Sequence, residues 1–253
     1  MAEIVFLGTA SAIPDEEHEN AYMAVIGSAN LALIDCAGNP VVRLRQANID
    51  ILKITDLVLT HFHPDHVSGV PLLLMNSWLL GRREPISIHG LAYTLDRVEA
   101  MMNLYRWDTW PGFYPVEFHR ILEEEGAVVL HNQDFRILAS PTSHLIPSIG
   151  LRIEWHDSGK TVAYSCDTEP NAAFIRLSKE VDVLIHEASG EASGHSSSRQ
   201  AGEVAQLAGA RALYLIHYPT DADGYQTLID QAKVAYLGPV ELAKDYLRLD
   251  FQT

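Results

Sequence analysis

Three histidines and one aspartate crowd into a seven-residue stretch of the chain. The stretch reads Thr60-His61-Phe62-His63-Pro64-Asp65-His66 and follows the apolar run 56–59, which has the character of a buried strand. Neutral imidazoles and carboxylates are the ligands that borderline divalent ions prefer, and a turn at a strand end can direct alternate side chains at one point. A solvated, histidine-rich turn is the alternative, but imidazoles this close repel one another when protonated. The spacing therefore favours a metal site.

Further metal-competent side chains follow other apolar runs along the chain. They are His144 after the run 135–140, Asp167 after 162–166, the pair His186-Glu187 after 183–185, and His217 after 213–216. Strand ends of this kind gather at one edge of a sheet, so four separate runs would deliver these groups to one place. Each alone could be an ordinary boundary residue. Together with the histidine-rich turn, they favour a shared site.

We expect Asp167 to lie between two ions, because a bridging carboxylate holds two ions roughly 3.5 Å apart, as in two-metal hydrolases. One ion would be bound by His61, His63, His144 and Asp167, and the other by Asp65, His66, Asp167 and His217. The excess of imidazoles over carboxylates favours zinc, with manganese as the alternative. Two ions that share a water lower its pKa toward neutrality, so this site would supply hydroxide for hydrolysis.

The elements that must position these residues are short strands in two blocks, interleaved with amphipathic helices. Strands are predicted over 4–7, 22–26, 31–35, 57–60, 86–89, 127–130, 135–140, 150–155, 161–165, 183–186 and 212–216. Helices are predicted over 41–47, 67–80, 91–105, 171–178, 196–209 and 223–237, the last ended by Pro239. This pattern is typical of an α/β fold, a four-layer αββα sandwich of two mixed β-sheets with helices outside.

Length and composition predict a soluble, cytoplasmic enzyme with one domain over residues 1–253. Hydrophobic residues make up 47% of the chain, and the longest apolar runs are strand-length, so no segment is expected to span a membrane. Glu3 stands where a signal peptide would carry basic residues. Cys36 and Cys166 match no CxxC pattern, so we expect reduced, buried thiols.

These motifs resemble those of the metallo-β-lactamase superfamily, and in particular its ribonuclease Z-like branch, over nearly the whole chain. The turn from His61 to His66 matches the His-x-His-x-Asp-His motif, and the other matching segments are 6–14, 33–38, 164–168, His186-Glu187-Ala188, 194–197 and 216–218. The resemblance implies the αββα fold and a metal-dependent hydrolase of ester bonds. Its metal ligands agree residue by residue with the two groups above.

Two features depart from ribonuclease Z and bear on the substrate. Those enzymes carry a long, basic, Gly/Pro-rich arm that grips transfer RNA, whereas here the segment from Thr168 to Asp182 resembles one ordinary helix. The chain also has a net charge of −15, while RNA binding rests on a localised basic surface. We therefore expect a phosphodiesterase for small, nucleotide-like or flexible phosphodiesters, and weak binding of folded RNA. The alternatives are transfer RNA 3′-end processing, hydrolysis of a sulfate ester or lactone, and a non-catalytic metal-binding scaffold.

Three residues are candidates for catalysis beside the ions. His195 lies at the start of a predicted helix, where N–H groups attract anions, and is the candidate general acid or charge stabiliser. Glu187 is the expected partner that orients the His195 imidazole. Asp65 is a candidate proton acceptor as well as a ligand. For His186, a role in the site and an ordinary structural role are equally open.

An aromatic-rich segment over about residues 78–118 is a candidate lid or pocket wall. It holds Trp78, Tyr93, Tyr105, Trp107, Trp110, Phe113, Tyr114 and Phe118, with Pro111, Gly112 and Pro115 interrupting regular structure. Aromatic faces stack on nucleobases, for about 1–3 kcal/mol per base. They also form cores and dimer contacts. A substrate pocket and a homodimer contact are therefore both open for this segment.

Overall fold

The computed structural model describes residues 2–220 and 224–252, which form two seven-stranded sheets. The first sheet has the order β14-β1-β2-β3-β4-β5-β6, with β1 (Glu3–Gly8), β2 (Tyr22–Ile26), β3 (Leu31–Ile34), β4 (Asp56–Val58), β5 (Ile86–Leu91), β6 (Val116–Ile121) and β14 (Arg248–Asp250). Strands β3 to β6 are parallel, and the pairs from β14 to β3 are antiparallel. The first sheet is therefore mixed.

The second sheet mirrors this arrangement. Its order is β13-β12-β11-β10-β9-β8-β7, with β7 (Ala127–His131), β8 (Phe135–Pro141), β9 (Ile149–Trp155), β10 (Thr161–Tyr164), β11 (Val183–Glu187), β12 (Leu213–Ile216) and β13 (Val240–Leu242). Strands β10 to β13 are parallel, and the pairs from β7 to β10 are antiparallel. Because β8 and β10 are both antiparallel to β9, they point the same way. Strands β8, β10, β11 and β12 therefore all end at one edge of the sheet.

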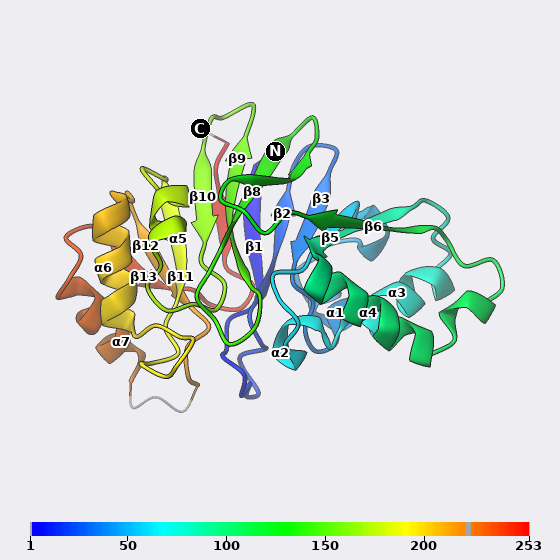
Figure 1. Ribbon diagram of the computed structural model, residues 1–253, viewed down its shortest axis with the longest axis horizontal. Coiled ribbons are helices and arrows are strands. Elements are labelled where there is room, and N and C mark those ends of the chain that lie inside the picture. The colour runs from blue at the N-terminus through cyan, green and yellow to red at the C-terminus, as the bar shows by residue number, and fades with distance from the viewer. Residues whose placement is uncertain (1, 221–223, 253) are drawn as a thin grey trace.

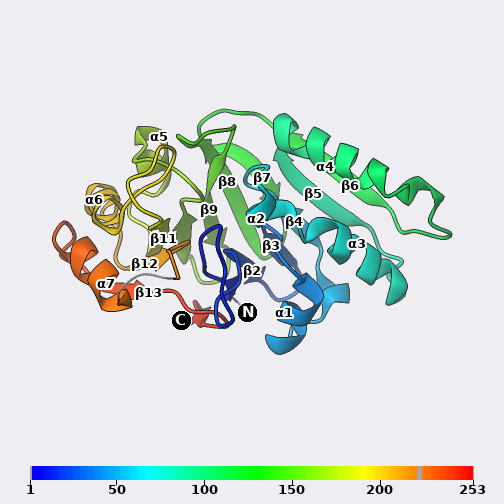
Figure 2. The ribbon, with the colours of Figure 1, turned by 90° about the horizontal axis from the view of Figure 1, so that it is seen from below.

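Helices cover the outer face of each sheet. Figures 1 and 2 show α1 (Pro40–Gln46), α3 (Val70–Leu79) and α4 (Ala92–Leu104) outside the first sheet, and α5 (Ala172–Leu177), α6 (Ser198–Ala208) and α7 (Tyr225–Lys233) outside the second. The short α2 (Pro64–Val67) follows β4, and single 3₁₀ turns lie at η1 (Ile51–Lys53) and η2 (Trp107–Thr109). None of the described helices is long and apolar enough to cross a membrane. The four-layer αββα fold predicted from the sequence is confirmed.

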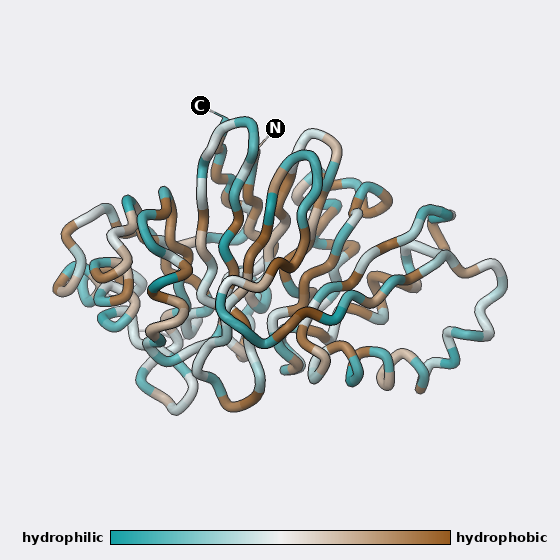
Figure 3. Tube along the Cα trace, turned by 45° about the horizontal axis from the view of Figure 1, so that its top comes forward, coloured by the Kyte–Doolittle hydropathy of each residue, from teal (hydrophilic) through white to brown (hydrophobic). Residues whose placement is uncertain are grey.

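Alternation of apolar residues along the strands builds the apolar layers of this sandwich. In β1, Ile4 and Phe6 pack with residues of the second sheet, while Val5 and Leu7 pack with residues of the helices. The side chain of Leu184 in β11 likewise packs toward α5 and α6. Figure 3 shows the hydrophobic colouring concentrated along the central strands. Strands covered on both faces require apolar residues at consecutive positions, as these have.

The structure differs from the predicted elements at short or polar segments. Strands β6, β13 and β14 were not predicted, because edge strands of this kind owe their conformation to pairing more than to a local apolar pattern. The helix expected over 67–80 begins later, as α3 at Val70, and the separate short helix α2 lies before it. Each has a proline in its first turn, where proline favours a helix start. The helix predicted over 223–237 ends earlier, at Lys233. Val234 and Leu237 are 73% and 95% exposed, so they have no apolar layer to join.

The aromatic-rich segment 78–118 contains regular elements rather than one continuous loop. The rings of Trp78 and Trp110 stack with their centroids 5.3 Å apart, and Trp107 packs edge-on against Phe113. These four residues are partly buried against the layer between the first sheet and its helices. An apolar pocket of about 390 Å³ lies along α3, lined by Ser68, Pro71, Leu72, Met75, Tyr105 and Trp110. Part of the aromatic content therefore stabilises the fold, and part borders a cavity.

Candidate metal centre

Five strand ends bring the predicted side chains to one edge of the sandwich. Strand β4 leads into the histidine-rich turn, β8 is followed by His144, β10 by Asp167 and β12 by His217, and β11 ends at Glu187. The N–H of Ile149, the first residue of β9, donates to the carbonyl of Thr60 at 3.2 Å and ties the two sheets together here. The expected convergence of strand ends is therefore present.

Two groups of four side chains place their ligand atoms within 4.8 Å of one another. The first group consists of His61, His63, His144 and Asp167, and the second consists of Asp65, His66, Asp167 and His217. These are the two ligand sets predicted from the sequence. The clusters are consistent with a binuclear metal site.

Asp167 turns a different carboxylate oxygen toward each group. Its Oδ2 lies 3.9 Å from Nε2 of His61 and 3.9 Å from Nε2 of His144. Its Oδ1 lies 3.5 Å from Nε2 of His66 and 3.5 Å from Nε2 of His217. Among the described residues, Asp167 Oδ1 and His66 Nε2 are buried and have no hydrogen-bond partner. Because an unsatisfied buried polar atom costs about 1–3 kcal/mol, this pair of neighbouring polar atoms fits a bound cation.

The first group brings imidazole nitrogens into close contact. Nδ1 of His63 lies 3.0 Å from Nε2 of His61 and 3.0 Å from Nε2 of His144. The Nδ1–H of His144 donates to the carbonyl of Gly194 at 2.7 Å, so its Nε2 carries the lone pair. Lone pairs this close repel unless a cation lies between them, and imidazole nitrogen is a preferred zinc ligand. The donor set therefore also fits an ion in the first group.

Burial and neighbouring charges set the protonation of these ligands. Burial lowers the pKa of His61, and the nearby His66 lowers it further. Burial and the neighbouring His144 also lower the pKa of His63. For Asp167, burial acts to raise the pKa, but the charges of His217 and His66 hold it well below its ordinary value. For His66 and His217, burial acts to lower the pKa, but the carboxylate of Asp167 raises it above the ordinary value. An ion in the second group would therefore displace protons from these imidazoles, because a histidine binds a divalent ion in its neutral form.

Two side chains that the sequence prediction did not assign contact two of the candidate ligand histidines. Oδ2 of Asp35 lies 2.9 Å from Nδ1 of His66, and Oγ of Ser189 lies 2.7 Å from Nδ1 of His217. Contacts of this kind fix which ring nitrogen faces the ion. Asp35 and Ser189 are 31 and 28 residues from their partners, so local spacing gives no sign of them. The usable signals for Asp35 are that it lies in the matching segment 33–38 and directly follows strand β3, the neighbour of β4.

The backbone is strained at three of these strand ends. Asp35, Cys166 and His217 have φ values of 63°, 54° and 51°, in the left-handed region that costs a non-glycine residue about 1–2 kcal/mol. Strain of this kind collects at functional sites, where surrounding contacts hold it in place. Here Sγ of Cys166 lies 2.9 Å from Oγ1 of Thr60. Cys36 and Cys166 are both free and buried, as predicted.

His195 and Glu187 form a pair beside the ligand groups. Nδ1 of His195 lies 3.1 Å and 3.3 Å from the two carboxylate oxygens of Glu187. This hydrogen bond raises the pKa of His195 and so favours its protonated form. Glu187 is fully buried, and its Oε1 also accepts the N–H of Thr168 at 2.7 Å. Because Nδ1 of His195 is bonded to Glu187, its Nε2–H is the group that can donate to a bound molecule.

Asp65 and His186, the two other candidates, have contrasting surroundings. Oδ2 of Asp65 lies 3.4 Å from Nε2 of His217 and 3.6 Å from Nε2 of His66. Burial acts to raise the pKa of Asp65, but the hydrogen bond to His217 and the charge of His66 bring it below its ordinary value. His186 is fully buried, its Nδ1–H donates to the carbonyl of Glu187 at 2.9 Å, and its ring packs edge-on against Phe174 of α5. His186 therefore lies toward the helices, outside both ligand groups.

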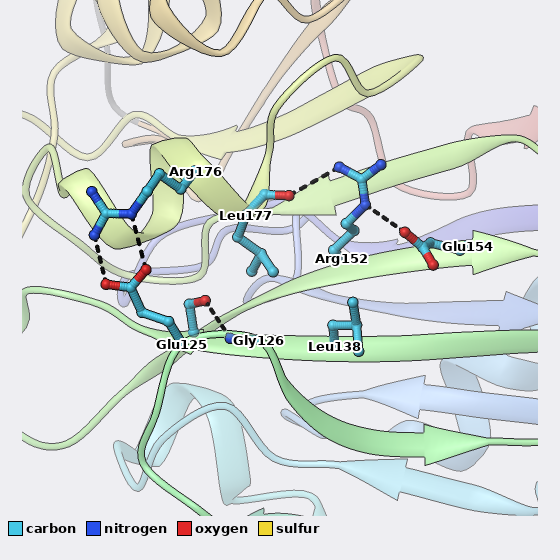
Figure 4. A pocket seen from close by; sticks show the side chains of 8 residues that line it. Glu125, Gly126, Leu138, Arg152, Glu154, Arg176 and Leu177 are labelled. Carbon is cyan, nitrogen blue, oxygen red and sulfur yellow. Dashed lines mark hydrogen bonds and ion pairs between the residues drawn. The ribbon is translucent and has the colours of Figure 1, made fainter.

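A separate cavity of about 360 Å³, beside α5, carries two arginines (Figure 4). Arg176 pairs with Glu125 through contacts of 2.5 Å and 2.9 Å, and Arg152 pairs with Glu154 at 2.8 Å. Figure 4 shows both guanidinium groups directed at these carboxylates. Since each cation is neutralised within the cavity, the cavity offers little net positive charge to a phosphate backbone.

Comparison with known proteins shows both a family and a fold. The family model described as Anti-Pycsar protein Apyc1 matches residues 2–238. Ribonuclease Z of Methanothermobacter thermautotrophicus is 26% identical over 306 aligned positions, which cover 99% of this chain and 97% of that protein. The crystal structure of human tRNase Z, short form, has a TM-score of 0.81 and 25% identity, over 98% of this chain and 99% of that chain. The metallo-β-lactamase fold protein YhfI of Bacillus subtilis has a TM-score of 0.81 and 22% identity, over 98% of both chains.

Proposed function

We propose, since this chain belongs to the Anti-Pycsar protein Apyc1 family, that it is a binuclear metal-dependent phosphodiesterase acting on small cyclic nucleotides. The observation that carries this proposal is the pair of ligand groups that share Asp167, beside the His195–Glu187 pair. The family suggests a small cyclic nucleotide as the substrate, in agreement with the small phosphodiester expected from the sequence.

The two ligand groups would hold two divalent cations, with zinc favoured and manganese as the alternative. When bound, such ions lower the pKa of a shared water to near neutrality and polarise a phosphoryl oxygen. Asp167 directs its two oxygens to different groups and so holds both in one arrangement. Asp65, whose pKa is lowered, is ionised at neutral pH, and its carboxylate can accept a proton from the attacking water.

His195 supports the reaction by supplying a proton to the leaving oxygen. Glu187 fixes Nδ1 of the imidazole and leaves Nε2–H free to act as the donor. Opening the ring of a cyclic nucleotide expels a ribose oxygen, which is a poor leaving group without a proton. The hydrogen bond to Glu187 raises the pKa of His195 and so favours the protonated imidazole that this step needs.

Several features support a small substrate over folded RNA. The net charge is −15, and between Asp167 and β11 the chain forms only the short helix α5. The alignment with the ribonuclease Z above runs over 306 positions, whereas this chain has 253 residues, so more than fifty positions of that protein have no counterpart here. RNA binding needs several phosphate contacts to basic side chains. A cyclic nucleotide carries one phosphate, which can lie wholly at the metal site.

Transfer RNA 3′-end processing is the second candidate function. It is favoured by the similarity to ribonuclease Z over 99% of this chain. Hydrolysis of a sulfate ester or lactone on the same centre, and a non-catalytic metal-binding scaffold, are further alternatives.

The test is a side-by-side assay of the metal-loaded protein. The panel holds purine and pyrimidine cyclic mononucleotides, a nitrophenyl phosphodiester, a sulfate ester, a lactone and a 3′-extended transfer RNA. We expect turnover of a cyclic nucleotide and weak binding of the RNA. The RNA affinity should depend only weakly on salt, since each neutralised phosphate contributes only about 0.7–0.9 to the slope of log affinity against log salt concentration. Specific cleavage of the RNA at its discriminator end, without turnover of cyclic nucleotides, would overturn the proposal.

The aromatic-rich segment keeps two interpretations, a substrate pocket and a homodimer contact. Tyr105 and Trp110 border the apolar pocket along α3. Ser68 also lines this pocket, and it lies two residues after the predicted ligand His66. A Trp110→Ala variant separates the two interpretations. A pocket wall predicts a raised KM in a protein of unchanged size, whereas a dimer contact predicts a shift in oligomeric state by sedimentation.

A further inference from the structure

We infer that Glu169 is a positioning residue, which holds the proton donor His195 in place relative to the metal ligand His144. The inference rests on the proposed function, because the position of His195 matters to turnover only if it donates a proton there. The segment involved is the loop of residues 188–197, which joins β11 to α6 and carries His195.

Glu169 connects two separate parts of the site. It lies two residues after Asp167, and its main-chain N–H donates to the carbonyl of Ser143, the residue before His144, at 2.8 Å. Its side-chain Oε1 accepts the N–H of Gly194, the residue before His195, also at 2.8 Å. One residue thus bonds to the neighbours of both a predicted ligand and the predicted proton donor.

Gly194 uses both of its backbone hydrogen-bonding groups for this connection. Its N–H donates to Glu169, and its carbonyl accepts the Nδ1–H of His144 at 2.7 Å. Its φ of +82° lies in the region that favours glycine, and a Cβ there would lie 2.9 Å from Nδ1 of His144. The position therefore excludes a side chain, and the Gly194 peptide joins His144 to the residue that carries the proton donor.

The remainder of the loop leaves a specific task for Glu169. Residues 191–193 are exposed, and on the far side of His195 the Oγ of Ser196 donates to the carbonyl of Thr168 at 2.6 Å. The bond from Gly194 to Glu169 restrains the loop on the near side of His195. Without this acceptor, we expect the backbone before His195 to move more freely. A misplacement of about 1 Å in a catalytic group can lower the rate about 10²-fold.

The experiment compares Glu169→Ala with Glu169→Gln, which keeps a side-chain oxygen as the acceptor. The matched control is Glu191→Ala, because Glu191 is an exposed residue of the same loop whose carboxylate accepts the hydroxyl of Ser197 at 3.2 Å. Two substrates are used, a cyclic nucleotide with a poor leaving group and a nitrophenyl diester with a good one. We expect Glu169→Ala to lower kcat on the cyclic nucleotide about 10–100-fold, with a smaller loss on the nitrophenyl diester. Glu169→Gln and Glu191→Ala should stay within a few-fold of the parent protein.

A second readout does not depend on turnover. In the metal-loaded protein, amide hydrogen exchange at residues 194–196 should be faster in Glu169→Ala than in Glu169→Gln or Glu191→Ala, with equal metal content in all three. Equal losses on both substrates, a loss shared by Glu169→Gln, or unchanged exchange would overturn the inference. If the parent protein turns over no diester, the proposed function fails, while the exchange comparison still decides whether Glu169 holds the loop.

Discussion

Oδ2 of Asp35 lies 2.9 Å from Nδ1 of His66, and neither side chain is exposed to solvent. Oδ1 of the same carboxylate accepts the N–H of Thr60 at 2.8 Å, at the start of the histidine-rich turn. Asp35 thereby orients His66, a candidate ligand of the second group. It also anchors the start of the turn that carries His61 and His63 of the first group. The ring nitrogen that His66 turns toward Asp167 is fixed before any ion binds.

We predict that Asp35→Asn weakens metal binding about 10–100-fold, the usual cost of losing a carboxylate that orients a ligand histidine. The measurement is competition for the metal against a chromogenic chelator, with circular dichroism to confirm folding. Asp56→Asn is the matched control, because Asp56 lies 2.8 Å from Nε2 of His89 but outside both ligand groups. Equal affinities in the two variants would contradict the assigned role of Asp35.

Replacement of His195 by alanine should leave the metal content intact and lower turnover about 10²–10⁴-fold, as expected for loss of a general acid. The loss should be smaller on substrates with good leaving groups, which need no proton from the protein. Steady-state kinetics on a nitrophenyl diester and on an unactivated diester measure the difference. An equal loss on both would identify His195 as structural.

The pH dependence of turnover should report the Glu187–His195 pair. The hydrogen bond to Glu187 raises the pKa of His195, so activity that needs the protonated imidazole falls as the pH rises through this raised pKa. Glu187→Gln removes the charge that favours the imidazolium, and we predict that the alkaline decline of kcat moves to lower pH. A profile of kcat against pH at saturating metal gives the answer. A decline at the same pH in both proteins would exclude His195 as its source.

Much of the grouping of side chains at this site could be predicted, because the candidate ligands lie where local sequence pattern is informative. The turn from His61 to His66 is local, and Asp167 and His217 each follow an apolar strand that the sequence marks clearly. Asp35 and Ser189 could not be assigned, because their contacts depend on how distant strands are ordered in the sheets. The edge strands β6, β13 and β14 escaped prediction for a related reason, since their conformation comes from a neighbouring strand.

The stability of the fold should depend on Asp134, in the turn between β7 and β8. Its Oδ2 accepts the N–H groups of Ala29 and Asn30 and the side-chain amide of Asn30, at 2.8–2.9 Å, and so joins the second sheet to the β2–β3 turn of the first. We predict that Asp134→Ala lowers the free energy of unfolding by about 1–3 kcal/mol at neutral pH, since three partly buried donor groups lose a charged acceptor. Asp157→Ala, at an exposed neighbouring turn, is the control.

The contribution of Asp134 to the free energy of unfolding should disappear in acid. Burial acts to raise the pKa of Asp134, but its hydrogen bonds to Ala29 and Asn30 hold the pKa below the ordinary value of 3.8. A depressed folded-state pKa stabilises the fold above the unfolded-state pKa, and this stabilisation is lost as the pH falls through the folded value. Urea unfolding at a series of pH values should show the difference between parent and Asp134→Ala narrowing below about pH 4. A constant difference would contradict the account.

The central claim is that Asp167 holds two ions in one site, and elemental analysis of the metal-loaded protein tests it most directly. The parent chain, purified without chelator and saturated with zinc or manganese, should contain about two equivalents of metal. Asp167→Ala removes a ligand from both groups and should retain at most one equivalent, with the fold confirmed by circular dichroism. A parent protein that binds one equivalent at saturation, or an Asp167→Ala variant that keeps both, would contradict the shared binuclear site.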